Sequence, residues 1–443
     1  MKRTLIYNGR FADMPAWAEA DAWVLIEGER IAATGRGRLP GAPGAAREDA
    51  RGALILPGMI DTHVHFREPG LTHKATIASE SRAAVLGGVT SYLEMPNTKP
   101  ATTSMAALEE KKEIAARDSA ANYGFFLGAS AKNIDEIRNL DPREVPGVKL
   151  FIGSSTGNMA VNAQNDLEAI FSASRVPIMV HAEDDAIIGE NTLKMRERYG
   201  EDIPVQGHPS IRSEEACVAA TRRAMDLARK TGARLHIAHV STAAELAETE
   251  GAERTTLEVT PLHLTFCSDD YGRSGARIKV NPAVKGRADR DALRAAVAAG
   301  RFTTIGSDHA PHLPEEKEGG ALKAASGAPS VQFALPLLLS EFPAETVVEL
   351  YSTGPARLFD IEGRGSLEAG NYADVAVVER AEYTLTDADV ASACGWTPFA
   401  GMTLRYRVRD VWVNGTRTVR DGALTGETHA RALRFDRGNK TKF

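Results

Sequence analysis

Short apolar runs alternate with longer amphipathic segments through the middle of the chain. In the amphipathic segments, apolar residues recur every three or four positions and charged residues occupy the other face, which is typical of surface helices. These segments are MAALEEKKEIAARD (105–118), DLEAIFSAS (166–174), EEACVAATRRAMDLARK (214–230) and DRDALRAAVAAG (289–300). The apolar runs are rich in β-branched residues and predict strands. We expect the strands at 60–65, 89–95, 123–127, 147–152, 176–181, 234–240, 255–260 and 302–308.

Eight strands interleaved with helices predict an α/β fold, a (β/α)8 barrel of the TIM type, over residues 58–364. The flanks differ from the centre, because residues 1–57 and 365–443 contain strand-like pieces separated by Gly and Pro. We expect both flanks to form one small composite β domain. Residues 313–330 follow the last predicted strand and are rich in Gly, Ala and charged residues, so they are a candidate lid.

The composition is that of an ordinary globular protein, with 43% hydrophobic and 25% charged residues in a chain of 443. The net charge of -6 argues against a nucleic-acid partner, because phosphate binding requires a basic surface. We expect no membrane association, since no apolar stretch approaches the roughly 18 residues of a membrane helix. Cys217, Cys267 and Cys394 are widely spaced and form no CxxC pair, which indicates buried thiols and a cytoplasmic protein.

Four histidines and one aspartate lie on or at the ends of predicted strands. His63 and His65 are two residues apart, so a strand would direct both to the same face. A lone histidine is more often a core residue than a ligand, but a pair on one face favours a metal. His181, His239 and Asp308 come from the fifth, sixth and eighth strands, whose C-terminal ends share one face of a barrel. Five ligands exceed the three that a catalytic zinc ion usually takes, which predicts two metal ions.

Two neighbouring metal ions usually share an anionic bridge, which the fourth strand should supply. Residues 145–165 contain no Asp or Glu, and Lys149 is the only ionisable side chain there. A lysine that reaches solvent or pairs with a carboxylate is the commoner case. A buried, unpaired ammonium beside two cations would be unfavourable. The missing carboxylate therefore favours a Lys149 that has reacted with carbon dioxide, because the resulting carbamate could bridge two Zn²⁺ ions.

This combination of ligands predicts hydrolysis of an amide-like bond. A water between two zinc ions can ionise near neutral pH and act as the nucleophile. Asp308 could hold one metal and also transfer the proton from the nucleophile to the leaving nitrogen.

Four further residues are candidates for binding the substrate. Taken singly, each would be interpreted as a surface charge or a turn residue. Their positions directly after predicted strands, beside the metal ligands, make them candidates together: Arg67, Asn97, Asn281 and His312. An arginine can bind a carboxylate through two parallel hydrogen bonds, so the pattern indicates an acidic small molecule. His263 and His309 are candidates for orienting the ligands, whereas His236 has no partner pattern.

Seven segments occur in an order that resembles the dihydroorotases of the amidohydrolase superfamily. They are DTHVHFREPG, GGVTSYLEMPNTKPATTS, VKLFIGSSTGN, VHAED, IAHVST, KVNPAVKG and TIGSDHAPH. GSLEAGNYADVAVV and GWTPFAGMTLRYRVRDVWVNG are similar to the C-terminal β segment of that family, so the resemblance covers nearly the whole chain. The HxH opening marks only the superfamily. HFREPG together with MPNTKP is more specific, because its Arg and Asn are the carboxylate-binding pair of the family.

The resemblance implies the reversible cyclisation of N-carbamoyl-L-aspartate to L-dihydroorotate in pyrimidine biosynthesis. It assigns His63 and His65 to one zinc ion, His181 and His239 to the other, and the bridge to Lys149. Asp308 would be a ligand and the general acid/base. The substrate would contact Arg67, Asn97, Asn281 and His312. Family members use either a bridging aspartate or a carboxylated lysine, and VKLF places this chain with the lysine type.

Two departures and two alternatives accompany this resemblance. Ala182 replaces a cysteine of the common HCED version, and Leu262 replaces the first histidine of a frequent TPHH; neither is a metal ligand in the family.

A hydantoinase or allantoinase would share the metal ligands, but that function gives no reason for Arg67 and Asn97 to occur together. A non-catalytic partner of another pyrimidine enzyme would be expected to have lost ligands. The assembly state is left open, with a homodimer as the candidate.

Overall fold

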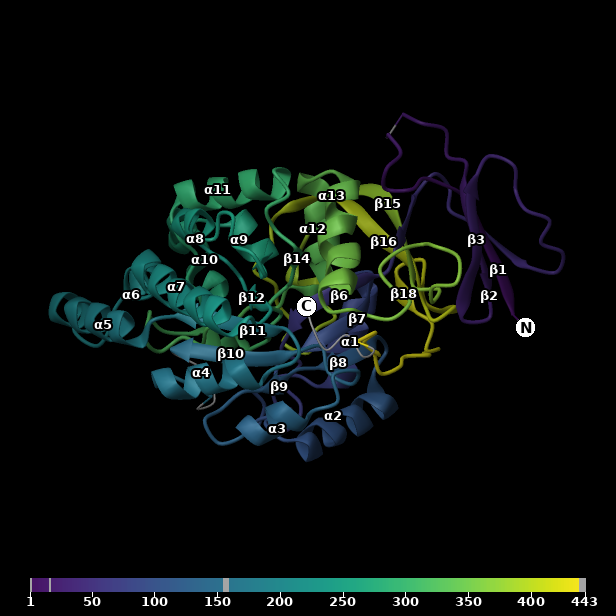
Figure 1. Ribbon diagram of the computed structural model, residues 1–443. Coiled ribbons are helices and arrows are strands. Elements are labelled where there is room, and N and C mark those ends of the chain that lie inside the picture. The colour runs from purple at the N-terminus through teal and green to yellow at the C-terminus, as the bar shows by residue number, and fades with distance from the viewer. Residues whose placement is uncertain (1, 16, 154–158, 438–443) are drawn as a thin grey trace.

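A computed structural model describes residues 2–15, 17–153 and 159–437 of the protein. Parallel strands at its centre form a barrel with helices outside, as Figure 1 shows. The predicted (β/α)8 barrel is confirmed. The third expected strand is divided at Phe126 into two short pieces, β8 and β9. The barrel strands are β6 (Met59–Val64), β7 (Val89–Glu94), β8 (Asn122–Phe125), β9 (Leu127–Gly128), β10 (Val148–Gly153), β11 (Ile178–Glu183), β12 (Leu235–Ile237), β13 (Thr255–Val259) and β14 (Thr304–Ile305).

Strand order follows the chain around the barrel, in one sheet β6-β7-β8 and a second sheet from β9 to β14. Two connections join these sheets. The amide of Phe126 donates to the carbonyl of Glu94 at 3.1 Å, and the amide of His65 donates to the carbonyl of His309 at 2.7 Å. The second connection lies beyond the end of β14, next to the metal-ligand candidates, so closure of the barrel brings the first and last strands together there.

The helices that were expected from apolar spacing are present and pack on the barrel. Helix α7 buries Cys217, Ala220, Ala224 and Leu227 on one face and ends at Gly232 in the left-handed conformation (φ 75°). The helices are α1 (Ile77–Leu86), α2 (Met105–Asp118), α3 (Ile134–Asn139), α4 (Gln164–Ala173), α5 (Asp185–Tyr199), α6 (His208–Ile211), α7 (Glu214–Thr231), α8 (Ala243–Glu248), α9 (Pro261–Thr265), α10 (Tyr271–Ser274), α11 (Arg287–Ala298), α12 (Val331–Glu341), α13 (Ala344–Val348) and α14 (Gly354–Leu358).

The flanking segments form two sheets beside the barrel. One has the order β3-β2-β1-β4 and the other β18-β17-β16-β15-β5. In the second sheet, residues 54–57 of the N-terminal flank pair antiparallel with residues 375–378 of the C-terminal flank. The strands are β1 (Arg3–Gly9), β2 (Ala22–Glu27), β3 (Arg30–Arg36), β4 (Ala46–Asp49), β5 (Leu54–Pro57), β15 (Val375–Thr384), β16 (Thr403–Val413), β17 (Thr416–Arg420) and β18 (Ala423–Leu424).

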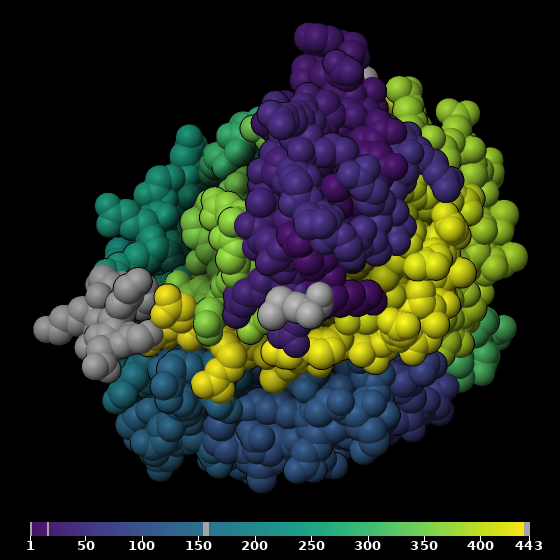
Figure 2. All heavy atoms as spheres, turned by 90° about the vertical axis from the view of Figure 1, so that its right-hand side faces the viewer, coloured from purple at the N-terminus to yellow at the C-terminus, as the bar shows by residue number. Residues whose placement is uncertain are grey.

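A shared apolar core explains why the two flanks come together. Ile6, Val24, Ile55, Val377 and Trp412 are almost fully buried against one another, although they come from opposite ends of the chain. Figure 2 shows the N-terminal segment lying directly on the C-terminal strands. The prediction of a β domain built from both termini is therefore confirmed, and we keep the boundaries at 57/58 and 364/365 as a proposal.

The segment 313–330 is ordered and lies against the barrel mouth. It begins with the short 3₁₀ helix η4 (Pro314–Lys317), and Nζ of Lys317 donates to the carbonyls of Lys279, Ala325 and Gly327 at 3.1, 2.6 and 2.7 Å. Whether the segment opens and closes as a lid stays a prediction. In the part of the chain that the structure describes, no helix has both the length and the apolar character needed to span a membrane.

Candidate active site

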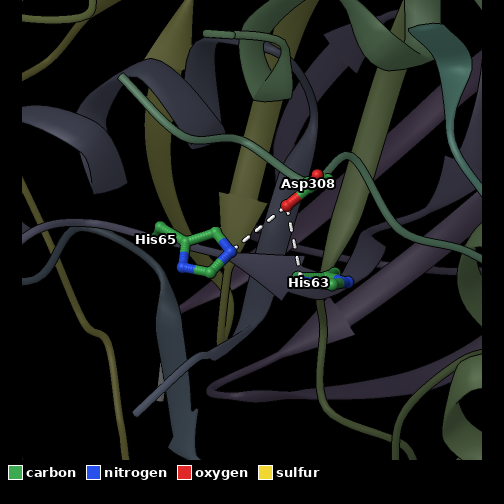
Figure 3. Close-up of side chains that lie close together, drawn as sticks. All are labelled: His63, His65 and Asp308. Atoms are coloured by element: carbon green, nitrogen blue, oxygen red, sulfur yellow. Dashed lines mark hydrogen bonds and ion pairs between the residues drawn. The ribbon is translucent and has the colours of Figure 1, made fainter. Parts of the chain in front are cut away.

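Three of the predicted ligands meet at the C-terminal end of the barrel, where Figure 3 shows both rings directed towards one carboxylate. Oδ1 of Asp308 lies 3.2 Å from Nε2 of His65 and 3.4 Å from Nε2 of His63. One ligand atom from each residue lies within 4.8 Å of the others. This spacing allows the three side chains to hold a single metal ion.

Neighbouring side chains determine which nitrogen each ring presents. Nδ1 of His63 is 2.8 Å from Oε1 of Glu258, and Nδ1 of His65 is 2.7 Å from Oδ1 of Asn97. Both oxygens are acceptors, so each ring carries its hydrogen on Nδ1 and leaves the Nε2 lone pair for a metal. Asn97, a candidate for substrate binding, thus also orients a ligand.

His181 and His239 form a second pair beside the first. Nδ1 of His181 lies 3.0 Å from Nε2 of His239, and the rings of His239 and His63 are 5.2 Å apart between centroids. Nε2 of His181 is 3.0 Å from Oε2 of Glu183, which also pairs with Arg212. Glu183 thus lies at ion-pair distance from Nε2 of His181, whereas Nδ1 of the same ring faces His239.

Lys149 on β10 is fully buried, and its Nζ has no hydrogen-bond partner among the described residues. The nearest ring is that of Phe151, with its centroid 5.4 Å from Nζ. Burial lowers the pKa of Lys149 to about 8, although attraction to Glu258 and Asp308 opposes this shift. An amine that is buried, unpaired and easily deprotonated is suited to carboxylation. Residues 154–158 of the VKLFIGSSTGN segment lie outside the described part of the chain.

The four candidate substrate-binding residues line one cavity of about 360 Å³ together with five of the predicted ligands. Arg67 donates from Nε to the carbonyl of Pro311 at 2.9 Å, and its Nη2 lies 3.0 Å from Nε2 of His312. Oδ1 of Asn281 is buried without a hydrogen-bond partner among the described residues. The cavity thus offers a guanidinium and an unused amide oxygen in addition to the histidine cluster.

A larger cavity of about 820 Å³ lies at the other end of the barrel. Its wall includes Pro57 and Thr303, which precede β6 and β14, and none of its described lining residues is a histidine. Since catalysis in this fold takes place at the C-terminal strand ends, the smaller cavity is the candidate active site.

Backbone conformation at the strand ends differs from the expected regular alternation. Strand β6 ends at Val64, so Arg67 does not continue the strand face of His63; it lies in the following loop with φ 71°. His239 and Asp308 likewise lie beyond β12 and β14, with φ 38° and 48°. Left-handed backbone is uncommon for such residues and occurs often at functional sites.

The protonation states of the histidine cluster are suited to binding a cation. Burial lowers the pKa of His65 to about 4, so the ring is neutral at pH 7. Burial raises the pKa of Asp308, but nearby His63 and His65 lower it by more, so the carboxylate is ionised. Burial also lowers the pKa of Arg67, to about 10, which leaves its guanidinium charged.

Sequence reasoning missed Glu258, Glu183 and Lys74. Glu258 is fully buried in β13, and its signal was a lone acidic residue within the apolar run TTLEVT. Glu183 follows His181 by two residues, a spacing that places both on one strand face.

Asp61 accepts hydrogen bonds from the amide of Ser307 at 2.9 Å and the hydroxyl of Tyr351 at 2.7 Å, so it stabilises the barrel instead of joining the cluster.

The remaining histidines lie outside the ligand cluster. His263 contacts Thr260 Oγ1 at 2.8 Å and the carbonyl of Pro282 at 3.0 Å, beside Asn281. His309 accepts at Nδ1 from the amide of Ser330 and lies 2.7 Å from Glu80 through Nε2. These contacts hold loops near the cavity.

Comparison with known proteins agrees with this geometry. A model of the amidohydrolase family matches residues 54–418. A dihydroorotase of Halobacterium salinarum is 36% identical over 414 residues, which cover 90% of this chain and 95% of the relative. An allantoinase of Rubrobacter xylanophilus is 35% identical over 403 residues, 86% of this chain and 88% of the relative. The structure of an L-hydantoinase from Arthrobacter aurescens matches with a TM-score of 0.91 and 26% identity, over 98% of this chain and 100% of that chain. The chain therefore belongs to the amidohydrolase family of enzymes.

Proposed function

We propose that this amidohydrolase is a dihydroorotase, which interconverts N-carbamoyl-L-aspartate and L-dihydroorotate. The observation that carries the proposal is the placement of Arg67 in the same cavity as the histidine cluster. A buried guanidinium that shares its cavity with Asn97 is suited to a carboxylate, and L-dihydroorotate carries a carboxylate on its ring. The relative from Halobacterium salinarum with the same name supports the proposal.

The donor set is suited to two divalent metal ions, which we propose to be Zn²⁺. His63, His65 and Asp308 would hold one ion, and His181 with His239 would hold the other. Lys149, as a carbamate, would bridge them, and its buried Nζ without a partner among the described residues supports this role. When bound, such ions would polarise the substrate carbonyl and lower the pKa of a water molecule.

Asp308 would move the proton in this reaction. Its carboxylate is ionised at neutral pH and lies at the barrel mouth, so it can accept the proton of the attacking water. As the ring opens, the same carboxyl group would donate this proton to the leaving nitrogen. In the direction of cyclisation, Asp308 would perform these two transfers in reverse order.

The other four residues would hold the substrate. Arg67 would bind its carboxylate, and Asn97 lines the same cavity. The unused Oδ1 of Asn281 would accept a ring N–H, and His312 would pack at the carboxylate end beside Arg67.

A hydantoinase or allantoinase is the second candidate function. The structure from Arthrobacter aurescens and the relative from Rubrobacter xylanophilus support it, because such enzymes share the fold. Comparing turnover of dihydroorotate, hydantoin and allantoin by the same preparation discriminates the two candidates. We expect dihydroorotate to be the best substrate, and faster turnover of an uncharged ring would contradict our proposal. Absence of both bound metal and activity would favour the non-catalytic alternative.

The bridging carbamate has its own test. We expect Lys149→Ala to abolish dihydroorotate hydrolysis and short carboxylic acids to restore part of the activity, because they can supply two oxygen atoms in the space of the carbamate. Lys112→Ala, at a partly exposed lysine on α2, is the control and should need no added acid. Full activity of Lys149→Ala without an added acid would show that the bridge is wrong. The homodimer remains a prediction, and light scattering can test it by measuring the molar mass in solution.

A further inference from the structure

The imidazole of His312 lies between two positively charged side chains at the cavity wall. Its Nε2 is 3.0 Å from Nη2 of Arg67 and 3.1 Å from the carbonyl oxygen of Ser326. Its Nδ1 is 3.0 Å from Nζ of Lys74, and Oε1 of Glu316 holds the same ammonium at 2.7 Å. Lys74 itself lines the cavity, so its contacts bear directly on the bound substrate.

The neighbours of Nδ1 determine which nitrogen of His312 carries the hydrogen. An ammonium and a guanidinium both have only donors, and a neutral imidazole has one acceptor nitrogen, so His312 cannot accept from Lys74 and Arg67 together. The acceptors decide between the two, and the carbonyl oxygen of Ser326 lies 3.1 Å from Nε2. The competing acceptor, Oε2 of Glu316, is farther from Nδ1, at 3.5 Å. The hydrogen is therefore on Nε2 and is donated to the carbonyl of Ser326. Because this Nε2 has no free lone pair in the ring plane, Arg67 cannot donate to it.

We propose that Lys74 is a positioning residue: it fixes the tautomer of His312 and so leaves the Nη2 hydrogen of Arg67 for a carboxylate of the substrate. Without Lys74, the hydrogen can move to Nδ1 and be donated to Glu316. Nε2 then accepts from Arg67, which removes one donor from the substrate. This inference rests on the proposed function, because it takes a ring acid as the substrate.

The charges of the cavity act in the same direction. Among the described residues that line it, Arg67, Lys74 and Lys99 are basic and only Asp308 is acidic. Asp308 belongs to the histidine cluster, so the charged side chains that line the rest of the cavity are basic. Burial and the charges of Arg67 and Lys74 also lower the pKa of His312, which keeps its ring neutral and able to accept from Lys74.

Kinetics with an acidic and an uncharged substrate test the proposal. We expect Lys74→Met to raise KM for dihydroorotate about tenfold, as for loss of one hydrogen bond to a charged group, and to change kcat by less than about threefold. Lys74→Arg should recover most of the affinity, because it restores a charged donor. Lys323→Met is the control, since Lys323 lies in segment 313–330 but pairs with Asp202 at the surface. Unchanged KM in Lys74→Met, or an equal loss with hydantoin, would overturn the proposal.

The tautomer can be measured directly by ¹⁵N NMR of histidine-labelled protein at mildly alkaline pH. We expect the His312 signals, assigned by their loss in His312→Asn, to show hydrogen on Nε2 in the wild type and a shift towards Nδ1 in Lys74→Met. Glu316→Gln weakens the ion pair that holds the Lys74 ammonium, although Glu316 does not line the cavity, and it should shift the His312 signals less. If Lys74→Met does not fold, Glu316→Gln carries the test. Hydrogen on Nδ1 in the wild type would refute the inference.

The two proposals fail in distinguishable ways. If the wild type turns over hydantoin or allantoin better than dihydroorotate, the proposed function is wrong, yet the tautomer measurement still decides the role of Lys74. If dihydroorotate is the best substrate and Lys74→Met retains both KM and the wild-type tautomer, only the inference about Lys74 is wrong.

Discussion

At the scale of single residues, acceptors behind the ligands determine the chemistry of the site. Glu258 illustrates this, because it accepts from Nδ1 of His63, from the hydroxyl of Thr62 at 2.7 Å and from the amide of His239 at 3.2 Å. One carboxylate therefore orients ligands from both histidine pairs. Gly306 leaves room for this arrangement, since a Cβ there would collide with Glu258 and His63.

We expect Glu258→Gln to weaken metal binding about 10- to 100-fold, because an uncharged amide makes His63 a less basic ligand. Competition for zinc with a chelator of known affinity measures the change. Glu245→Gln is the matched control, since Glu245 is equally buried but contacts Ser241 and Thr242 instead of a ligand. Equal metal affinity in the two variants would show that Glu258 has no orienting role.

Carboxylation of Lys149 should depend on pH in the metal-free protein. Only the neutral amine attacks carbon dioxide, and burial lowers the pKa of this lysine to about 8. The neutral fraction therefore rises steeply between about pH 7 and pH 9, whereas a lysine with the usual pKa of about 10.4 stays largely protonated. At constant dissolved carbon dioxide, the carbamate signal in ¹³C NMR should appear faster at the higher pH. It should be missing in Lys149→Ala, and a rate independent of pH would contradict the prediction.

At the scale of elements, three strands end just before residues of the candidate active site. Arg67, His239 and Asp308 all lie beyond their strands with positive φ, which turns their side chains towards the cavity. Hydrogen bonds from the neighbouring loops hold these positions, as in the contact of Arg67 with Pro311. Strand periodicity therefore located the residues in the chain, but it gave no account of their orientation.

The segment 313–330 is held in place by Lys317. We expect Lys317→Met to loosen it, because three buried carbonyls would lose their donor at a cost of about 2 to 4 kcal/mol. Ser326 and Gly327 line the cavity, so KM for the substrate should rise as well. Hydrogen exchange of the segment measures the loosening, and Lys323→Met again serves as the control. Unchanged exchange would mean that backbone contacts alone hold the segment.

At the scale of the whole molecule, the site is assembled only when the barrel closes. The contact between His65 and His309 joins the two ends of the barrel, and it lies beside Asp308. Candidate ligands from the ends of four strands, which span residues 63 to 308, then share one cavity. The composite β domain packs at the side of this barrel and brings together both flanks of the chain.

Removal of divalent metal should lower the unfolding temperature of the whole protein by several degrees. Ions that bind only the folded state stabilise it, by about 4 kcal/mol at a thousandfold excess over Kd. Calorimetry after chelation and after readdition of zinc measures the change. A variant with both His181→Ala and His239→Ala lacks one pair of ligands and should respond less. An identical unfolding temperature with and without metal would contradict the proposed metal site.

Much of this protein could be predicted from local patterns in its sequence. Periodicity located the eight barrel strands and the helices α2, α4, α7 and α11, because burial of one face requires regular spacing, but it did not locate α5, which has no buried residues. The HxH pair and the motifs around Arg67 and Asn97 identified the family, and the family match confirmed that this chain is an enzyme of that kind. The ligand roles and the reaction remain predictions.

Contacts between distant segments were decided only by the tertiary structure. Glu258 and His63 are far apart in sequence, and nothing in the local pattern states that one carboxylate meets that ring. Likewise, Lys74 reaches His312 only because the loop after β6 packs against segment 313–330. Spacing along the chain predicts on which face of a strand or helix a side chain lies. Hydrogen-bond partners and tautomers depend instead on which distant segments the closed barrel brings to within 3 Å of each other.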